Sequence, residues 1–189
     1  AAAYDDAQPH LYEVLDERPG GTIEVHGPGG SGARADDAVA VEAKDGVEVR
    51  AVEHDVGYAG HGRSDRTYRG TVYVTIGADG RLAAVNALPL EQLVRGIVPA
   101  EIYATAPMEA LKAQAVTARG EILAKIGARH LADPHAICAE QHCQVYKGRS
   151  GEHPATDLAI AATRGEVLLA PDGRLVDSVF SATCGGHTE

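Results

Sequence analysis

The clearest helical pattern in this chain is PMEALKAQAVTARGEILAKIG, residues 107–127. Its apolar residues recur three or four positions apart, at Leu111, Ala115, Ala118, Ile122 and Ile126. That spacing places them on one face of an α-helix. Pro107 suits a first helical turn and Gly127 suits a helix end. We therefore expect a long amphipathic helix here, although Gly120 within it should cost about 1 kcal/mol relative to alanine.

Segments on both sides of this helix predict antiparallel strands. Each pair is separated by a short turn that suits a hairpin, and the pairs are residues 38–42 with 46–50, 71–76 with 81–85, and 166–170 with 174–180. Two further stretches, residues 88–100 and 154–164, show helical spacing. The expected fold class is α+β, with antiparallel strand units flanking a central helical block and a metal-stapled loop.

Composition narrows the function classes. The chain has 189 residues, with 17 basic and 27 acidic side chains and a net charge of −10. A nonspecific nucleic-acid binder needs a basic surface, so this balance argues against nucleic-acid partners. The apolar runs are too short for a transmembrane segment. The chain begins Ala1-Ala2-Ala3 and its only methionine is Met108, which leaves a removed leader open.

One stretch has the glycine spacing of a dinucleotide-binding loop. Residues 27–32 read GPGGSG, which fits G-x-G-x-x-G after a strand. A nucleotide site also needs a helix directly after the loop, and residues 33–38 are too short and polar to supply one. We interpret residues 27–32 as a surface loop.

A Cys/His cluster follows the long helix. His135, Cys138, His142 and Cys143 lie within nine residues, and they offer the ligand types and number that tetrahedral zinc prefers. His130 could replace His135. A Cys138–Cys143 disulfide and two unbound thiols are the alternatives. A zinc ion with four protein ligands would be structural, because no position stays open for water.

Glu101 lies between two predicted helices with apolar residues on both sides. Desolvation raises the pKa of a carboxyl group and lets it act as a general acid near neutral pH. By itself this position fits a solvated helix end better. Arg119 on the long helix, and Gln144 and Tyr146 after the cysteine pair, are ordinary residues on spacing alone.

Several longer segments resemble one family. They are LPLEQLVRGIVPAE (88–101), PMEALKAQAVTAR (107–119), CAEQHCQVY (138–146), TRGEVL (163–168) and FSATCGGHTE (180–189). In this order they resemble the stage II sporulation protein D family, also called the SpoIID/LytB amidase-enhancer family. The resemblance predicts a catalytic domain over residues 66–189, truncated at its C-terminal end, after a strand-rich lobe at residues 1–65.

The resemblance implies a lytic transglycosylase that cleaves peptide-stripped peptidoglycan between N-acetylmuramic acid and N-acetylglucosamine. It implies catalysis by Glu101 and zinc binding by Cys138, His142 and Cys143, with His135 as our choice of fourth ligand. Under the same resemblance Arg119, Gln144 and Tyr146 are candidates to bind sugars or to hold Glu101. The product would be a 1,6-anhydro sugar, which requires no second carboxylate, and the sequence shows none obviously beside Glu101.

Two rival functions stay open at this point. One is a non-catalytic wall-binding module that activates a cell-wall amidase, and the other is a zinc hydrolase built on the Cys/His cluster. The expected location is extracytoplasmic, either secreted, periplasmic or in the cell wall. Gly120 departs from the family, which usually has a small hydroxyl residue there, and we expect a softer helix at that point.

Overall fold

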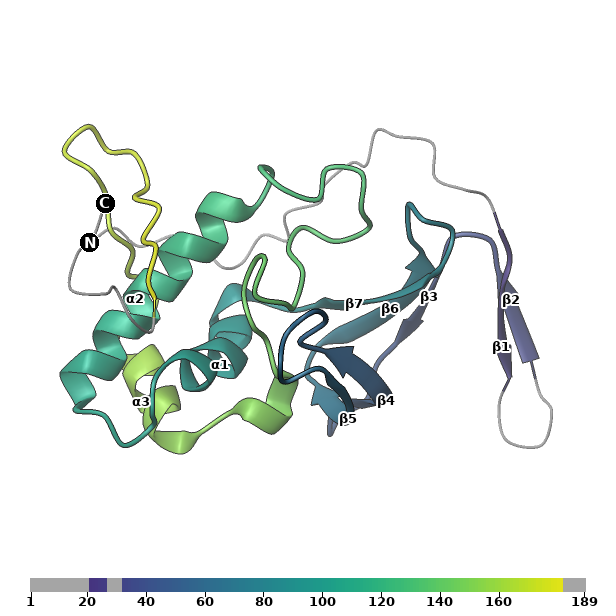
Figure 1. Ribbon diagram of the computed structural model, residues 1–189, viewed down its shortest axis with the longest axis horizontal. Coiled ribbons are helices and arrows are strands. Elements are labelled where there is room, and N and C mark those ends of the chain that lie inside the picture. The colour runs from purple at the N-terminus through teal and green to yellow at the C-terminus, as the bar shows by residue number, and fades with distance from the viewer. Residues whose placement is uncertain (1–20, 27–31, 182–189) are drawn as a thin grey trace. The chain divides into compact units, whose positions relative to one another are not determined.

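The computed structural model describes residues 21–26 and 32–181. They form two compact units that interleave along the chain. One unit contains Pro89–Ile126 and residues 137–181, and the other contains residues 21–88 with Gly127–Ala136. The mixture of helices and antiparallel sheets confirms the α+β class (Figure 1). The predicted boundary between residues 65 and 66 stays a prediction.

The strand-rich unit contains seven strands in three small antiparallel sheets among the described residues. In chain order they are β1 (Ile23–His26), β2 (Gly32–Ala35), β3 (Ala38–Val41), β4 (Val47–His54), β5 (Gly62–Tyr68), β6 (Thr71–Ile76) and β7 (Leu82–Ala87). The sheets are β1-β2, β3-β6-β7 and β4-β5. Residues 27–31 of the Gly-rich stretch lie outside the description, as do Cys184 and His187. The next residues, Gly32–Ala35, form β2 and not the helix that a nucleotide site would need.

Two of the hairpin predictions differ from the structure. The β6-β7 hairpin forms as expected, with Thr71 opposite Ala87. By contrast β3 pairs with β6, and β4 pairs with β5, so the hairpin predicted for residues 38–50 is wrong. Pairing with β6 sets Val39 and Val41 of β3 opposite Val residues, and β-branched cross-strand pairs stabilise a sheet. The last predicted hairpin forms only over a short stretch: Leu169 and Leu175 make an antiparallel bridge, the Ala170 N–H donates to the Arg174 carbonyl, and the Val176 N–H donates to the Leu168 carbonyl.

Three helices pack together in the other unit, as predicted. They are α1 (Leu90–Glu101), α2 (Met108–Lys125) and α3 (Pro154–Ala162), with a short 3-10 helix η1 (Gly148–Gly151) before α3. The predicted stripe of α2 is its buried face, because Leu111, Ala115, Ala118 and Ile122 are at most 1% exposed. Figure 1 shows α2 as the long helix beside α1 and α3. No helix in the described part is both long and apolar enough to cross a membrane.

Two glycines in this unit allow close approach between segments. A Cβ at Gly120 would lie 2.8 Å from Ser178 Oγ, and a Cβ at Gly96 would lie 2.5 Å from the Tyr146 ring. A side chain at either position would therefore push away a packed segment. The glycine at position 120 lets residues 176–178 pack directly against α2. Close packing therefore accounts for this departure from the family, where the sequence had predicted a softer helix.

Candidate functional site

Glu101 is the last residue of α1, and the chain leaves the helix there because Ile102 adopts an extended backbone. A turn closed by the Ala106 N–H on the Tyr103 carbonyl then leads into α2. The Glu101 residue is exposed, yet its carboxyl is held in place: Gln144 Nε2 donates to Glu101 Oε1 over 2.7 Å. Gln144 itself is only 4% exposed. The structure thus joins a reachable carboxyl group to a buried amide 43 residues away.

The surroundings of Glu101 favour its protonated form. Burial of the carboxyl raises the pKa of Glu101, and the nearby Glu121 charge raises it further. The hydrogen bond from Gln144 lowers the pKa, as do the charges of Lys147 and Lys125, but the net direction is upward. A raised pKa keeps the proton on the carboxyl at higher pH, which is what a general acid requires. This direction agrees with the desolvated carboxyl that the sequence left open and not with the solvated helix end that it favoured.

Glu121 corrects one expectation, since it is a second carboxylate whose charge acts on Glu101. It lies on α2 with 6% exposure, and its Oε1 accepts from Lys125 Nζ over 2.5 Å. Lys125 also donates to the carbonyl oxygen of Cys143. The sequence signal was the i,i+4 spacing of Glu121 and Lys125 on a predicted helix, but this spacing is common on solvated helix faces.

The Cys/His loop brings three candidate ligands together. His142 Nδ1 lies 3.7 Å from Cys138 Sγ and 3.5 Å from Cys143 Sγ, and one ligand atom from each residue lies within 4.8 Å of the others. Both cysteines are thiols and are not joined as a disulfide. Burial raises the pKa of the Cys138 thiol. Two thiols and an imidazole at this separation fit a metal ion that takes sulfur and nitrogen ligands.

The two candidates for a fourth ligand, His130 and His135, both lie in the segment Gly127–Ala136. Their ring centroids are 4.5 Å apart. His130 Nδ1 is 2.7 Å from Asp133 Oδ2. The His135 ring is partly buried, burial lowers its pKa, and its Nε2 has no hydrogen-bond partner among the described residues. Both rings have features of a metal ligand, so the choice of His135 stays a prediction.

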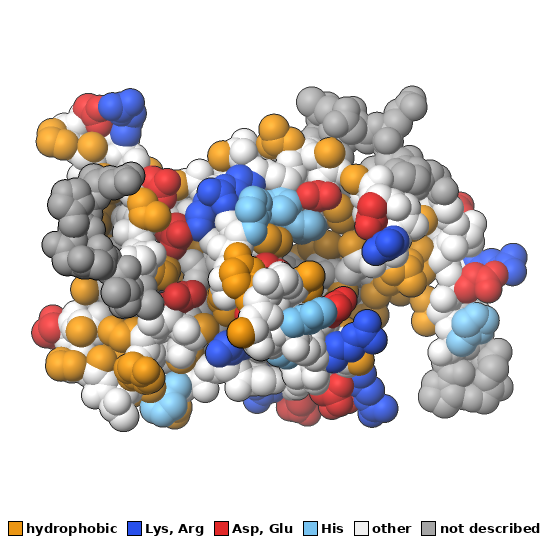
Figure 2. All heavy atoms as spheres, in the orientation of Figure 1, with side chains coloured by type: hydrophobic (Ala, Val, Ile, Leu, Met, Phe, Trp, Pro, Cys, Tyr) orange, Lys and Arg blue, Asp and Glu red, His pale blue; other side chains and the backbone are white. Residues whose placement is uncertain are grey.

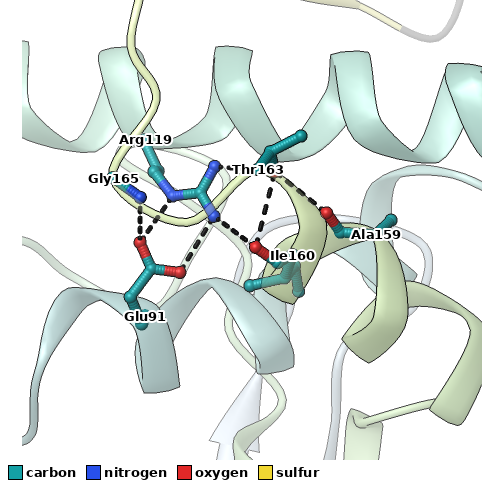
Figure 3. Close-up of polar contacts among 6 residues, drawn as sticks. All are labelled: Glu91, Arg119, Ala159, Ile160, Thr163 and Gly165. Atoms are coloured by element: carbon teal, nitrogen blue, oxygen red, sulfur yellow. Dashed lines mark hydrogen bonds and ion pairs between the residues drawn. The ribbon is translucent and has the colours of Figure 1, made fainter. Parts of the chain in front are cut away.

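Arg119 is not placed to touch a sugar, because its side chain is 0% exposed. Its Nε and Nη2 donate to the two oxygens of Glu91 at 2.8 and 2.9 Å (Figure 3). Nη1 also donates to Thr163 Oγ1 and Nη2 to the Ile160 carbonyl, while the Gly165 N–H donates to Glu91. This buried network ties α1, α2 and the end of α3 together, which replaces the expected sugar contact with a structural role.

The remaining candidates differ in exposure. Tyr146 is 7% exposed and packs against Gly96, so its ring supports the loop, and a sugar contact by it stays a prediction. Tyr103, which the sequence reasoning did not single out, is 87% exposed two residues after Glu101. An exposed aromatic ring can pack against an apolar face of a ligand. On the face that Figure 2 shows, basic side chains are scattered among acidic ones and form no continuous basic surface.

Comparisons with known proteins agree with the resemblance. A family model described as "SpoIID: Stage II sporulation protein" matches residues 78–169. The chain is 32% identical over 120 residues to stage II sporulation protein D of Bacillus amyloliquefaciens, covering 56% of this chain and 35% of that protein. It is 36% identical over 96 residues to the amidase enhancer of Bacillus subtilis, covering 51% of this chain and 12% of that protein.

An uncharacterized protein of Brachyspira hyodysenteriae is 36% identical over 108 residues, which is 57% of this chain and 29% of that protein. The chain thus spans about a third or less of the length of these relatives. No solved structure matches. The matched segment contains Glu101, Gln144 and the cysteine pair. The resemblance to the stage II sporulation protein D and amidase-enhancer family is therefore confirmed, and residues 78–169 carry its SpoIID segment.

Proposed function

We propose that this chain is a peptidoglycan lytic transglycosylase, with Glu101 as its general acid and base. The observation that supports this most directly is the Glu101 carboxyl, which is reachable, partly desolvated and held by Gln144. The substrate class comes from the family resemblance and from the cell-wall role that the name of the amidase-enhancer relative suggests.

The reaction needs one carboxyl group used twice. Glu101 first donates its proton to the glycosidic oxygen, the bond from this oxygen to C1 of the muramic residue breaks, and positive charge develops at C1. The 6-hydroxyl of the same residue then forms the new bond to C1 and gives its proton to the Glu101 carboxylate. The products are a 1,6-anhydro end and a new 4-hydroxyl end, and Glu101 regains its starting proton. Glu121 is not needed as a nucleophile, which fits its burial and its pairing with Lys125.

The product distinguishes this reaction from hydrolysis. Peptide-free glycan strands incubated with the chain in water enriched in ¹⁸O should yield anhydro-muramic ends that carry no label, measured by mass spectrometry. A hydrolase digest run in parallel should give labelled reducing ends. Labelled ends from this chain, or no cleavage at any pH tested, would contradict the proposal.

A second function is favoured by the name of one relative, an amidase enhancer. In that case the chain would bind wall glycan and stimulate a partner amidase. The same preparation added to a cell-wall amidase separates the two: faster peptide release without anhydro ends would favour the enhancer.

We also propose that Cys138, His142 and Cys143 hold a structural zinc ion, with a histidine as the fourth ligand. A closed site of this kind stabilises the fold because the ion binds the folded chain. Removing the ion with a chelator should lower the Tm, by about 2–4 °C for each kcal/mol of stabilisation that the ion provides. The measurements are calorimetry and metal content.

Cys138→Ser should lower the metal content from about one ion per chain toward zero. Cys184→Ser removes a thiol that the proposed site does not use and should keep the ion. Equal metal content in both variants would reject the assignment. A chelator that stopped turnover while leaving the Tm unchanged would favour the zinc hydrolase instead.

A further inference from the structure

Lys125 has surroundings unusual for a lysine in the last turn of a helix. Its side chain is 12% exposed, and its ammonium group contacts both Glu121 Oε1 on α2 and the carbonyl oxygen of Cys143 in the loop. A lysine side chain is rarely buried unless an opposite charge pairs with its ammonium group. The contact with Cys143 therefore does more than satisfy a helix end: it joins α2 to the loop that leads to Gln144.

A pair on the same helix shows the ordinary case. Lys112 Nζ lies 2.8 Å from Glu109 Oε1, with side chains 32% and 84% exposed. Exposed pairs of this kind contribute little, because water competes for both charges. The pair formed by Glu121 and Lys125 is buried and reaches a third group in another segment. Both are Lys–Glu ion pairs on α2, but the pair formed by Glu121 and Lys125 also holds the carbonyl of Cys143 in the loop.

The contact on Cys143 bears directly on Glu101. The carbonyl that accepts from Lys125 belongs to the peptide unit whose nitrogen is that of Gln144, so holding this carbonyl fixes the peptide plane from which Gln144 extends. The Gln144 amide then donates to Glu101. We propose that Lys125, anchored by Glu121, is a positioning residue that holds Gln144 against the Glu101 carboxyl.

Glu121 has a feature that fits an anchor. Its Oε2 is buried without a hydrogen-bond partner in the described part of the chain. A buried carboxylate oxygen left unpaired is unfavourable, and the ion pair of the other Glu121 oxygen with Lys125 offsets part of that cost. The charged groups that act on Glu101 are Glu121, Lys147 and Lys125, and the first raises its pKa while the other two lower it. Lys125 therefore acts on Glu101 both through Gln144 and through its own charge.

The effect on turnover rests on the proposed function, so the test has a second readout that does not. Lys125→Met removes the charge and the donor from a side chain of similar length. The ¹³C signal of the Glu101 carboxyl should titrate with a higher midpoint in this variant, because a nearby positive charge and a firm hydrogen bond, which both favour the carboxylate, are lost. Glu121→Gln has two opposing effects, because it removes a like charge that raises the Glu101 pKa and also releases Lys125, so Lys125→Met is the variant that carries the test. Lys112→Met is the matched control and should leave the midpoint unchanged.

On peptide-free glycan, Lys125→Met should lower kcat tenfold or more with KM nearly unchanged, because misplacing a catalytic group slows the reaction without weakening sugar binding. Lys125→Arg, which keeps the charge and the donors, should recover most of the loss. A merely structural lysine would instead lower the Tm and leave kcat of the folded fraction unchanged, and the midpoint shift of Lys125→Met would then be the same with Gln144→Ala, because only the lost charge would act on Glu101.

The outcomes separate the two proposals. A Glu101 midpoint that does not move in Lys125→Met overturns the positioning role, whatever the activity. A midpoint shift that shrinks when Gln144 is also replaced by alanine, in a parent chain that shows no cleavage, supports the positioning role and rejects the proposed function. If Lys125→Met does not fold, Lys125→Gln replaces it, with the same direction expected and the same result overturning the proposal.

Discussion

Glu101→Gln is expected to lower kcat for glycan cleavage by about 10³-fold, the largest effect of any single change in this chain. General acid–base catalysis contributes about 10²–10⁴-fold, and here one carboxyl group serves as acid and then as base. A glutamine cannot give a proton to the leaving oxygen or take one from the 6-hydroxyl. It has the same shape and keeps a polar atom for Gln144, whose Nε2 contacts Glu101 at 2.7 Å, so the fold should survive. The rate of formation of anhydro-muramic ends measures the effect.

The control for this change is Glu109→Gln. Glu109 lies in the first turn of α2 with a side chain 84% exposed, so the same chemical change there should leave kcat within about twofold. Matching Tm values would show that both variants are folded. Parent-like cleavage by Glu101→Gln would remove Glu101 from the mechanism, and the buried Glu121 would then be the next carboxyl group to test.

Arg119→Met should give the largest loss of stability, about 3–5 kcal/mol in the free energy of unfolding. It leaves the carboxylate of Glu91, which is 7% exposed, buried without its cation, and uncompensated buried charges are strongly unfavourable. The guanidinium also donates to Thr163 and the Ile160 carbonyl, and both groups would lose a partner (Figure 3). For a domain of this size the Tm should fall by about 6–20 °C. Urea unfolding and calorimetry measure both quantities.

Two further variants make this result specific. Arg174→Met breaks a pair with Asp172 whose side chains are 84% and 50% exposed, and it should change stability by less than about 1 kcal/mol. Glu91→Gln combined with Arg119→Met should lose less than the sum of the two single changes, because the partners compensate one another. A loss for Arg119→Met no larger than that for Arg174→Met would contradict the buried network.

Local features of the sequence were enough to predict the helices. The apolar period of residues 107–127, with proline before it and glycine after it, predicted α2 to within a few residues. Such signals are reliable because each depends on neighbours three or four positions away in the chain. The Cys/His ligands could be grouped for a related reason, since Cys138, His142 and Cys143 are close in sequence. The family resemblance rests on short sequence segments of this kind. The helical spacing placed Glu101 between two helices, and it is the last residue of α1.

Contacts between residues far apart in the chain could not be predicted from the sequence. Nothing near Gln144 in the chain indicates that its amide meets Glu101, and nothing near Lys125 indicates that it reaches the Cys143 carbonyl. Arg119 looked like a surface residue on a helix, yet packing against α1 and α3 buried it completely. The strand pairs of β3 and β4 likewise depended on competing partners of similar local quality.

For this protein, the sequence alone determined which segments are helical, which family the chain resembles and which side chains carry the candidate chemistry. Only the tertiary structure decided which of these side chains meet, which are buried and how the charges around Glu101 balance. The physical reason is that helix formation follows from short-range periodicity, whereas burial, pKa shifts and long-range hydrogen bonds depend on how separate elements pack.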